Sequence, residues 1–570
     1  MKQYFFTLLL SFMWIPSFGK TVSDELQERV YVQTDKQLYL AGEQIRMKIL
    51  TVDTELIPLV FSTVAYAELV RDSMARVQIK VALTDGVGEG RMSLPVDLKT
   101  GYYRLIAYTQ YMRNEGTEVF FEKNIVVVNT FQQDYNPGTA NVTNTPYKDL
   151  QSVLSQLSSF NFQLSTPEAV SLQPDKSVYS TREQGFLTLS GLPATIHTLS
   201  VSISGIEMNT TASSSFQNKP PKNTTGFTDE YLPEYEGHII TGTIIDNQTG
   251  TAGIDNAPLI PVISFLGKEI NFFTGQKSPA GEVLFVTSGN YDTKEIAAVV
   301  YNGDEKYRID LRSPFITRFA PKPMPELYID STFYDQLLER SVALQTMRYF
   351  INDSIENNNM SGTFYKTKPT NSYLLDEYTR FPTMQEVFTE CISSARFRRR
   401  DEKRELSVIV RNGDNSYYGS NPLVLLDGAP VSNHEHIYNY NPLLVECINI
   451  YNSVCILGGY SFEGIIELKT YRGLAQDLDF EKSTQIIRYE GPQRVESFRT
   501  PDYSTEQNRK NRMPDSHHTL LWNPDIQTAG QTTILLPFET SDFTGEFQAI
   551  VEGVTEEGQV VFTTSFFIVE

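Results

Sequence analysis

The sequence has few of the residues on which enzymes and redox proteins depend. Its 570 residues include only three cysteines and six histidines. The cysteines form no Cys-x-x-Cys pair, which argues against redox and zinc-ribbon sites. Gly-x-Ser-x-Gly, P-loop and His-Glu-x-x-His motifs are also missing. We therefore predict that the protein is not an enzyme, and we assign no catalytic, cofactor-binding or metal-binding residue.

Long apolar runs are missing beyond the N-terminus, which argues against helical membrane spans. The first residues combine a positive charge at Lys2, a short apolar run, a helix-breaking Pro16 and small residues up to Gly19. This pattern is typical of a secretory signal peptide, which we place at residues 1–19. We expect an exported protein without an integral membrane span.

Positive charge is scarce as well, since the formal net charge is -21. An acidic surface repels phosphate backbones, which argues against nucleic-acid binding. One cationic island lies between Arg396 and Arg404. Two interpretations of this run remain open: a solvated strand or loop, and a contact with lipid phosphates or an acidic partner.

Tyrosine, phenylalanine, glycine and proline are plentiful, whereas long helical periodicity is scarce. This mixture favours many short strands separated by turns. A single hydrophobic core stops growing near about 250–300 residues, so a chain of 570 residues is expected to hold several domains. We predict a mainly β protein built from tandem β-sandwiches.

One motif occurs twice in the first third of the chain. Residues 35–44 read Asp-Lys-Gln-Leu-Tyr-Leu-Ala-Gly-Glu-Gln, and residues 175–184 share five of these positions in register. The first copy, together with a later Gly-Tyr-Tyr-Arg-Leu strand that begins at Gly101, resembles the macroglobulin-like domain of the alpha-2-macroglobulin family. The resemblance implies immunoglobulin-like β-sandwiches at residues 22–130 and 165–230.

Members of that family that trap proteases use a Cys-Gly-Glu-Gln thioester, which this sequence lacks. Covalent trapping is therefore excluded, and non-covalent protease inhibition stays open as an alternative function. Because Asp35, Lys36 and Tyr39 all recur in the second copy, we interpret them as a shared device of the fold.

Residues 237–315 resemble the carboxypeptidase-regulatory-like sandwich found at the start of many TonB-dependent receptors. The similarity rests on a Gly-x-Ile-x-Asp strand that ends at Asp246 and on a later hairpin. In that hairpin Phe285 matches the family pattern, while Val283 stands where phenylalanine is expected. The module implies no peptidase chemistry. A connecting helix is predicted at residues 331–350 from the spacing of its apolar residues.

Residues 370–475 resemble the plug domain of TonB-dependent outer-membrane receptors. An apolar strand ends in an Asp-Gly turn at Asp427, and a later Gly-Ile-Ile-Glu-Leu-Lys-Thr strand ends at Thr470. Thr383 and Glu386 predict a capping box at the start of a short helix. About 100 residues follow Thr470, whereas a receptor barrel needs about 22 strands of about 10 residues each. The resemblance implies a small α+β plug-like domain without a transmembrane barrel.

Alternatives remain open at three places in this region. We interpret Asp427 as a turn residue rather than a functional group. His434 and His436 would share one face of a strand, so a metal site competes with a solvated loop there. Cys447 and Cys455 flank a predicted strand-turn and either pair in an oxidising compartment or remain small buried side chains.

Residues 485–570 are predicted to form a closing β-sandwich. The order of modules is similar to that of Gram-negative envelope proteins that combine them. The resemblance implies a non-enzymatic scaffold in the periplasm or at the outer membrane that binds a protein partner, such as an outer-membrane barrel or a transport component. Service as a plug-like accessory of TonB-dependent transport is the alternative.

Overall fold

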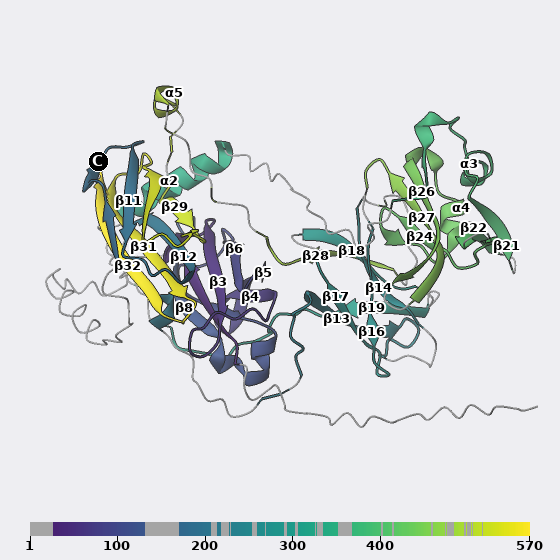
Figure 1. Cartoon of the computed structure of the whole chain (residues 1–570), viewed down its shortest axis with the longest axis horizontal. Coiled ribbons are helices and arrows are strands. Elements are labelled where there is room, and N and C mark those ends of the chain that lie inside the picture. The colour runs from purple at the N-terminus through teal and green to yellow at the C-terminus, as the bar shows by residue number, and fades with distance from the viewer. Residues whose placement is uncertain are drawn as a thin grey trace, which may run out of the picture.

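Figure 1 shows the computed structural model, in which two β-sandwiches lie together and a third carries an α+β unit. The predicted signal peptide at residues 1–19 lies outside the described residues. Among the described residues, no helix combines the length and apolar character needed to cross a membrane. The structure describes residues 27–131, 170–206, 214–217, 227–228, 230–252, 259–267, 270–289, 293–301, 306–324, 327, 334–350, 368–400, 403–412, 415–457, 460–473, 475, 484–494, 498, 503, 505–512, 514–515 and 517–570.

The first sandwich packs a three-stranded sheet, β1-β3-β6, on a five-stranded sheet, β2-β8-β7-β4-β5. Alternating apolar side chains of both sheets form one core, as expected for a two-layer sandwich. Short β2 pairs in parallel with β8, while the other pairs are antiparallel. The elements are β1 (Arg29–Thr34), β2 (Leu38–Leu40), β3 (Gln44–Val52), β4 (Val64–Arg71), β5 (Met74–Ala82), β6 (Val87–Ser93), β7 (Gly101–Tyr108), η2 (Tyr111–Glu115), η3 (Thr117–Val119) and β8 (Phe121–Val128).

The second sandwich is built from two distant parts of the chain. Its sheets are β10-β32-β31-β12-β29 and β30-β11-β9, so β12 lies between two strands from the C-terminal region. The prediction of separate sandwiches at 165–230 and 485–570 is therefore wrong, because neither half closes a core alone. The strands are β9 (Ser171–Pro174), β10 (Val178–Tyr179), β11 (Gln184–Ser190), β12 (Ile196–Gly205), β29 (Thr519–Asn523), β30 (Thr533–Glu539), β31 (Gly545–Thr555) and β32 (Val560–Val569).

The third sandwich also includes a strand from further along the chain. Its sheets are β16-β17-β13-β19 and β15-β14-β18-β28, and β28 lies beyond the predicted limits of 237–315. Val283 and Phe285 of β17 are both buried in its core. The strands are β13 (His238–Asp246), β14 (Pro261–Phe265), β15 (Asn271–Thr274), β16 (Gln276–Lys277), β17 (Glu282–Thr287), β18 (Thr293–Val300), β19 (Tyr307–Leu311) and β28 (Gln485–Glu490).

The α+β unit contains the sheets β20-β26-β27-β24-β25 and β21-β22-β23 with two short helices. The predicted capping box is confirmed, since Thr383 and Glu386 cap α3 reciprocally. The elements are β20 (Asn371–Leu374), η7 (Leu375–Glu377), α3 (Met384–Glu390), β21 (Ala395–Arg400), β22 (Lys403–Asn412), β23 (Asn415–Tyr418), β24 (Leu423–Leu426), β25 (Ala429–Pro430), α4 (His434–Tyr438), η8 (Pro442–Leu444), β26 (Val445–Leu457) and β27 (Tyr460–Thr470).

The predicted connecting helix is confirmed as α2 (Tyr334–Phe350). Its Leu337 packs with Leu38 and Val126 against the first sandwich. Two shorter helices complete the described elements, η4 (Ser215–Gln217) and α5 (Glu506–Arg509). The mainly β class with tandem sandwiches is therefore confirmed.

Buried contacts join neighbouring units. The Thr519 hydroxyl of the second sandwich donates to Asp35 of the first at 3.0 Å, and the Trp522 indole donates to Glu89 at 3.1 Å. Between the third sandwich and the α+β unit, apolar residues of both units share one core. There the Gly267 amide donates to the Asp427 carbonyl at 2.9 Å.

Candidate functional site

The repeated motif builds the same hydrogen-bonded turn in both sandwiches. The Tyr39 hydroxyl donates to Asp35 at 2.7 Å, and the Arg46 amide donates to the same carboxylate oxygen at 3.0 Å. In the second copy, the Tyr179 hydroxyl donates to Asp175 at 2.7 Å. Both tyrosine rings are buried. These residues fix the entry of a strand into each sandwich and leave no open site.

Asp427 holds the chain that follows β27. Its buried carboxylate accepts hydrogen bonds from the Thr470 amide and the Ala475 amide, both at 2.7 Å, and from the Thr470 hydroxyl at 2.5 Å. Asp427 and Gly428 have φ values of 49° and 85°, so the backbone reverses in the left-handed region that glycine adopts readily. Asp427 acts as a clamp in the fold, as a turn residue is expected to do.

His434 and His436 lie on a helix, α4, where we expected a strand or loop. Two positions along a helix rotate side chains by about 200°, so the two rings do not share a face. The Leu406 amide donates to His434 Nδ1 at 3.0 Å, and burial lowers the pKa of His434 to about 4. Within the described part of the chain, no group of three or more His, Cys, Asp or Glu side chains is arranged to hold a metal ion.

The three cysteines are free thiols. Cys447 and Cys455 lie on the same continuous strand, β26, and are not separated by a turn. Eight residues of extended strand place their Cα atoms about 26 Å apart, far beyond the reach of a disulfide. The alternative of an intramolecular Cys447–Cys455 bond is therefore wrong.

A buried polar cluster joins the first and third sandwiches. The Tyr66 hydroxyl donates to the Glu234 carboxylate at 3.0 Å, and His238 Nδ1 lies 2.7 Å from the same group. Lys80 Nζ lies 3.5 Å from His238 Nε2 and 4.1 Å from the ring centre of Tyr489. We refer to Tyr66, Lys80, Glu234, His238 and Tyr489 as the junction cluster.

Burial shifts the pKa values of His238 and Lys80. It lowers the pKa of His238, although the neighbouring Glu234 acts in the opposite direction. It also lowers the pKa of Lys80 to about 8, again partly offset by Glu234. His238 and Lys80 are each only 4 % exposed, so a substrate has no access to them. The cluster therefore holds two units together. Sequence reasoning missed it because its members come from distant segments of the chain without a shared motif.

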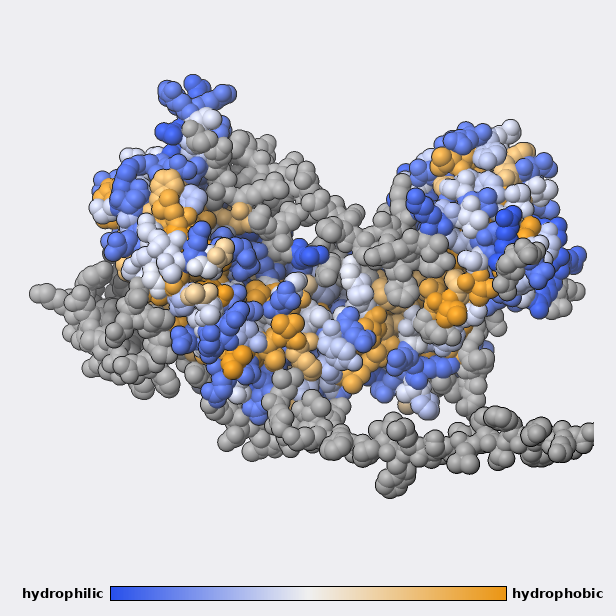
Figure 2. Space-filling view, in the orientation of Figure 1, coloured by the Kyte–Doolittle hydropathy of each residue, from blue (hydrophilic) through white to orange (hydrophobic). Residues whose placement is uncertain are grey.

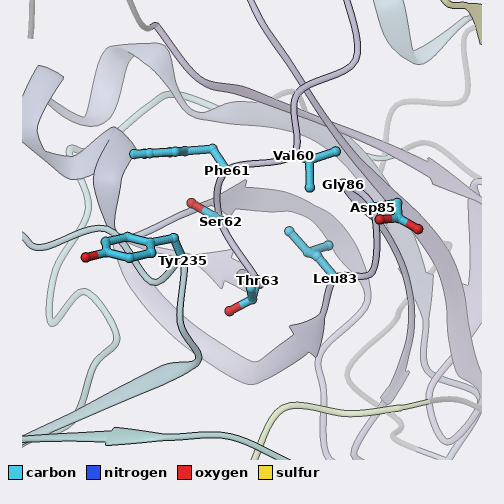
Figure 3. A pocket seen from close by; sticks show the side chains of 8 residues that line it. All are labelled: Val60, Phe61, Ser62, Thr63, Leu83, Asp85, Gly86 and Tyr235. Carbon is cyan, nitrogen blue, oxygen red and sulfur yellow. The ribbon is translucent and has the colours of Figure 1, made fainter. Parts of the chain in front are cut away.

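A surface cleft of about 380 Å³ lies beside the junction cluster (Figure 3). Figure 3 shows Tyr235 and Phe61 on one side of the cleft and Val60 with Leu83 on the other. Val60 is 67 % and Tyr235 is 58 % exposed, so the rim is apolar and open to solvent. The Thr63 amide donates to the Glu234 carbonyl at 2.9 Å, which ties the floor of the cleft to the junction cluster.

Ser62, at the bottom of the cleft, is tied to a buried carboxylate. Its hydroxyl donates to Glu28 at 2.7 Å, and the Thr109 hydroxyl donates to the same group at 2.5 Å. Burial raises the pKa of Glu28, and these hydrogen bonds only partly oppose the shift. Ser62 has no histidine among the hydrogen-bond partners described for it, and its role is to fix the loop that forms the cleft.

The cationic island forms the hairpin of β21 and β22, at the outer end of the α+β unit (Figure 1). The guanidinium groups of Arg396 and Arg398 lie 4.0 and 4.3 Å from the ring centre of Tyr418. Hydrophilic residues gather over this end of the molecule in Figure 2. The run thus lies on a strand hairpin whose cations are exposed to solvent, and its contact with lipid phosphates or an acidic partner stays a prediction.

Comparison with known proteins identifies one domain family. Residues 29–122 match the model of the MG2 domain, so the first sandwich is a macroglobulin-type domain. No curated protein matches the chain.

Solved structures with similarity to the chain include two bacterial macroglobulins and an adhesin. Salmonella alpha-2-macroglobulin reacted with methylamine is 9% identical, with a TM-score of 0.24 over 95% of this chain and 39% of its own. The native Escherichia coli alpha-2-macroglobulin is 11% identical, with a TM-score of 0.24 over 96% of this chain and 40% of its own. The Escherichia coli adhesin FdeC is 11% identical, with a TM-score of 0.15 over 50% of this chain and 65% of its own. The chain thus spans well under half the length of these macroglobulins, and similarity at such TM-scores carries no argument about function.

Proposed function

We propose that the protein is a non-enzymatic, exported scaffold of the Gram-negative envelope that binds a protein partner, in the periplasm or at the outer membrane. One observation carries the proposal: the α+β unit displays a cationic edge hairpin, β21–β22, in a protein whose net charge is -21. Such a local reversal of charge favours recognition of a partner, because charge complementarity selects and orients binding surfaces.

The arrangement of the units supports a scaffold. The α+β unit shares a core with the third sandwich, and the junction cluster fixes that sandwich to the macroglobulin-type domain. The hairpin is therefore presented on a rigid support rather than on a linker. A rigid support lowers the entropy that is lost when a partner binds.

Finer assignments belong to this proposal. The third sandwich corresponds to a carboxypeptidase-regulatory-like module, and the α+β unit to a plug-like domain. Support for the second assignment comes from the parallel pair β24–β27, joined through the clamped Asp427 turn. An outer-membrane barrel is the partner that a plug-like domain implies.

Membrane fractionation followed by crosslinking and mass spectrometry of the tagged, full-length protein tests the proposal. We expect the protein in the envelope fraction, with crosslinks from residues 368–475 to a specific outer-membrane protein. As a control for the charge of the hairpin, Lys99→Glu with Arg318→Glu reverses two cations far from it. This variant should keep the crosslinks. Recovery of the protein alone, with no reproducible partner, would contradict the proposal.

A second candidate function is that of a plug-like accessory in TonB-dependent transport. The strand that leads to Asp427 and the strand that ends at Thr470 favour it, because the plug resemblance rests on these two segments, which pair in parallel. Deletion of the gene should then reduce uptake through the crosslinked barrel, whereas a pure scaffold changes the position or amount of the barrel without changing uptake per barrel.

A further inference from the structure

We propose that the free edge of β21 is a docking site for an extended, acidic segment of a protein partner, which adds to the sheet as a further strand. The inference rests on the proposed function, because it assigns the surface through which the partner is held. The partner segment is an extended strand with carboxylate side chains on alternate residues.

Among the described residues, β21 pairs with another strand on one side only. In the sheet β21-β22-β23, β22 is the one described strand that pairs with β21. The Ile409 amide donates to the Ser394 carbonyl at 2.8 Å. In an antiparallel pair, every second residue forms hydrogen bonds with the neighbouring strand, so this bond shows which residues of β21 face β22. Arg396, Arg398 and Arg400 therefore direct their backbone groups toward β22. The intervening residues direct theirs toward the free edge.

Phe397 and Arg399 are the residues that offer the edge backbone groups. Phe397 is held in place because its ring packs at 5.1 Å from Phe388 and 5.2 Å from Tyr438, measured between ring centres. This packing of Phe397 holds β21 in place, so the strand does not need a partner to become ordered. An incoming strand gains main-chain hydrogen bonds at little entropic cost.

The charges of β21 are only partly paired within the described part of the chain. Arg400 lies 3.8 Å from Glu405, and Arg404 lies 3.3 Å from Glu435. By contrast, Arg396 and Arg398 are stacked on Tyr418 and form no ion pair with a described residue. Stacking on a ring leaves the edges of a guanidinium group available to carboxylates.

The spacing of the arginines matches an extended partner. Side chains two positions apart on a strand lie on one face and about 6.6 Å apart. Arg396, Arg398 and Arg400 therefore repeat at the same interval as alternate acidic side chains of a neighbouring strand. Cross-strand pairs of opposite charge stabilise the pairing of two strands.

A protein strand fits this surface better than a lipid headgroup. Lipid phosphates accept hydrogen bonds but offer no donor to the outward carbonyl groups of Phe397 and Arg399. In addition, the net charge of -21 repels an extended anionic surface over about one Debye length, roughly 8–10 Å. A narrow acidic strand approaches the hairpin alone and avoids most of that repulsion.

A labelled peptide tests the proposal with the full-length protein. The probe is an eight-residue peptide that alternates glutamate and valine, and binding is followed by fluorescence anisotropy. We expect saturable binding that weakens as salt rises. Arg396→Glu with Arg398→Glu should weaken it at least tenfold, while Lys99→Glu with Arg318→Glu, an equal change of charge elsewhere, should leave it unchanged.

A second pair of variants separates strand addition from simple attraction of charge. Arg399→Ala removes one cation, whereas Arg399→Pro also removes the amide that faces the free edge, which an edge strand tolerates. We expect Arg399→Pro to bind the peptide at least fivefold more weakly than Arg399→Ala, with equal thermal stability. A peptide methylated on alternate amides should likewise lose binding.

Several outcomes would overturn the proposal. These are no saturable binding below about 1 mM, equal binding of the methylated peptide, and equal binding by Arg399→Pro and Arg399→Ala. Vesicles of phosphatidylglycerol that bind the hairpin when the peptide does not would assign the surface to lipid. If crosslinking to the envelope partner survives Arg396→Glu with Arg398→Glu, the scaffold function stands and this surface assignment fails.

Discussion

Arg340 of α2 and Glu43 of the first sandwich form a two-pronged ion pair, with Nη2–Oε2 and Nε–Oε1 distances of 2.6 and 2.9 Å. Burial by itself raises the pKa of Glu43, but Arg340 and Lys36 outweigh it and hold the pKa well below its usual range. The ion pair fixes α2 to the macroglobulin-type domain. In the second copy of the motif, Glu183 is half-buried and pairs with Lys176 alone among described cations.

We expect Arg340→Met to destabilise the first sandwich by about 3 kcal/mol, because it leaves a buried carboxylate without its main partner. Glu43 has a lowered pKa, so its contribution is complete above the ordinary carboxyl pKa and is lost as pH falls through the folded value. Urea unfolding at pH 7 measures the change. Arg340→Met combined with Glu43→Gln should recover part of the loss. A change below about 0.5 kcal/mol would show that the pair has no net effect.

The two copies of the tyrosine motif should respond differently to loss of the hydroxyl. Tyr39→Phe leaves the buried Asp35 with one donor fewer, at a cost of about 1–3 kcal/mol. Tyr179→Phe should cost less, about 0.5–1 kcal/mol, because Asp175 is exposed and water replaces the hydroxyl. Parallel urea titrations compare them. Equal costs would mean that burial of the acceptor does not decide the effect.

Stability at the junction cluster should fall as the pH drops from about 7.5 to 5.5. The folded pKa of His238 lies below the ordinary value of about 6.5, so in that range the unfolded chain binds a proton that the folded protein excludes. Subtracting the profile of His238→Gln from that of the wild type isolates this contribution, because Glu234, Lys80 and the tyrosines remain. Identical profiles would show that His238 has the same pKa in the folded and unfolded chain.

Asp427→Ala should destabilise the α+β unit by about 3 kcal/mol, since three buried hydrogen bonds lose their charged acceptor. Hydrogen exchange at Thr470 and Ala475 reports the local effect. Asp376→Ala is a matched control, because Asp376 is exposed, where it accepts a hydrogen bond from Tyr471 at 2.7 Å and lies 3.5 Å from Arg380. The control should change stability by less than about 1 kcal/mol. Comparable losses in both variants would argue against the clamp.

Thiol labelling should find three free cysteines after denaturation and one that reacts first in the native protein. Cys391 is partly exposed, whereas Cys447 and Cys455 are buried, and burial raises the pKa of Cys455 to about 11. Maleimide labelling followed by peptide mapping gives the order of reaction. Recovery of a linked peptide pair containing Cys447 and Cys455 would contradict the extended β26 strand.

Local features of the fold were predictable from sequence because they depend on neighbouring residues. The capped helix at Thr383 and the turn at Asp427 follow from short-range hydrogen bonds, and α2 follows from its apolar spacing. Partnerships over long distances were not predictable. Thr198 of β12 and Asp525 lie 327 residues apart yet contact each other at 3.3 Å, and no local pattern encodes that pairing.

Some features of the candidate site were likewise predictable from the sequence, and others were not. The cationic run around Arg396 was visible in the sequence, because charge of one sign stands out in an acidic chain. The free edge of β21 was not visible in the sequence, because an edge exists only where no other strand pairs. The junction cluster was invisible for a related reason: Lys80, His238 and Tyr489 meet only after three separate segments fold.

The split second sandwich has a consequence for biosynthesis. Strand β12 pairs with β29 and β31, and both leave the ribosome more than 300 residues after it. During that interval the apolar face of β12 has no native cover, and late, long-range pairing of this kind is slow. In the exported protein that we propose, the unfolded chain is therefore expected to depend on holdase chaperones until its last strands arrive. Truncation before Thr519 should yield an aggregating product rather than a shorter working protein.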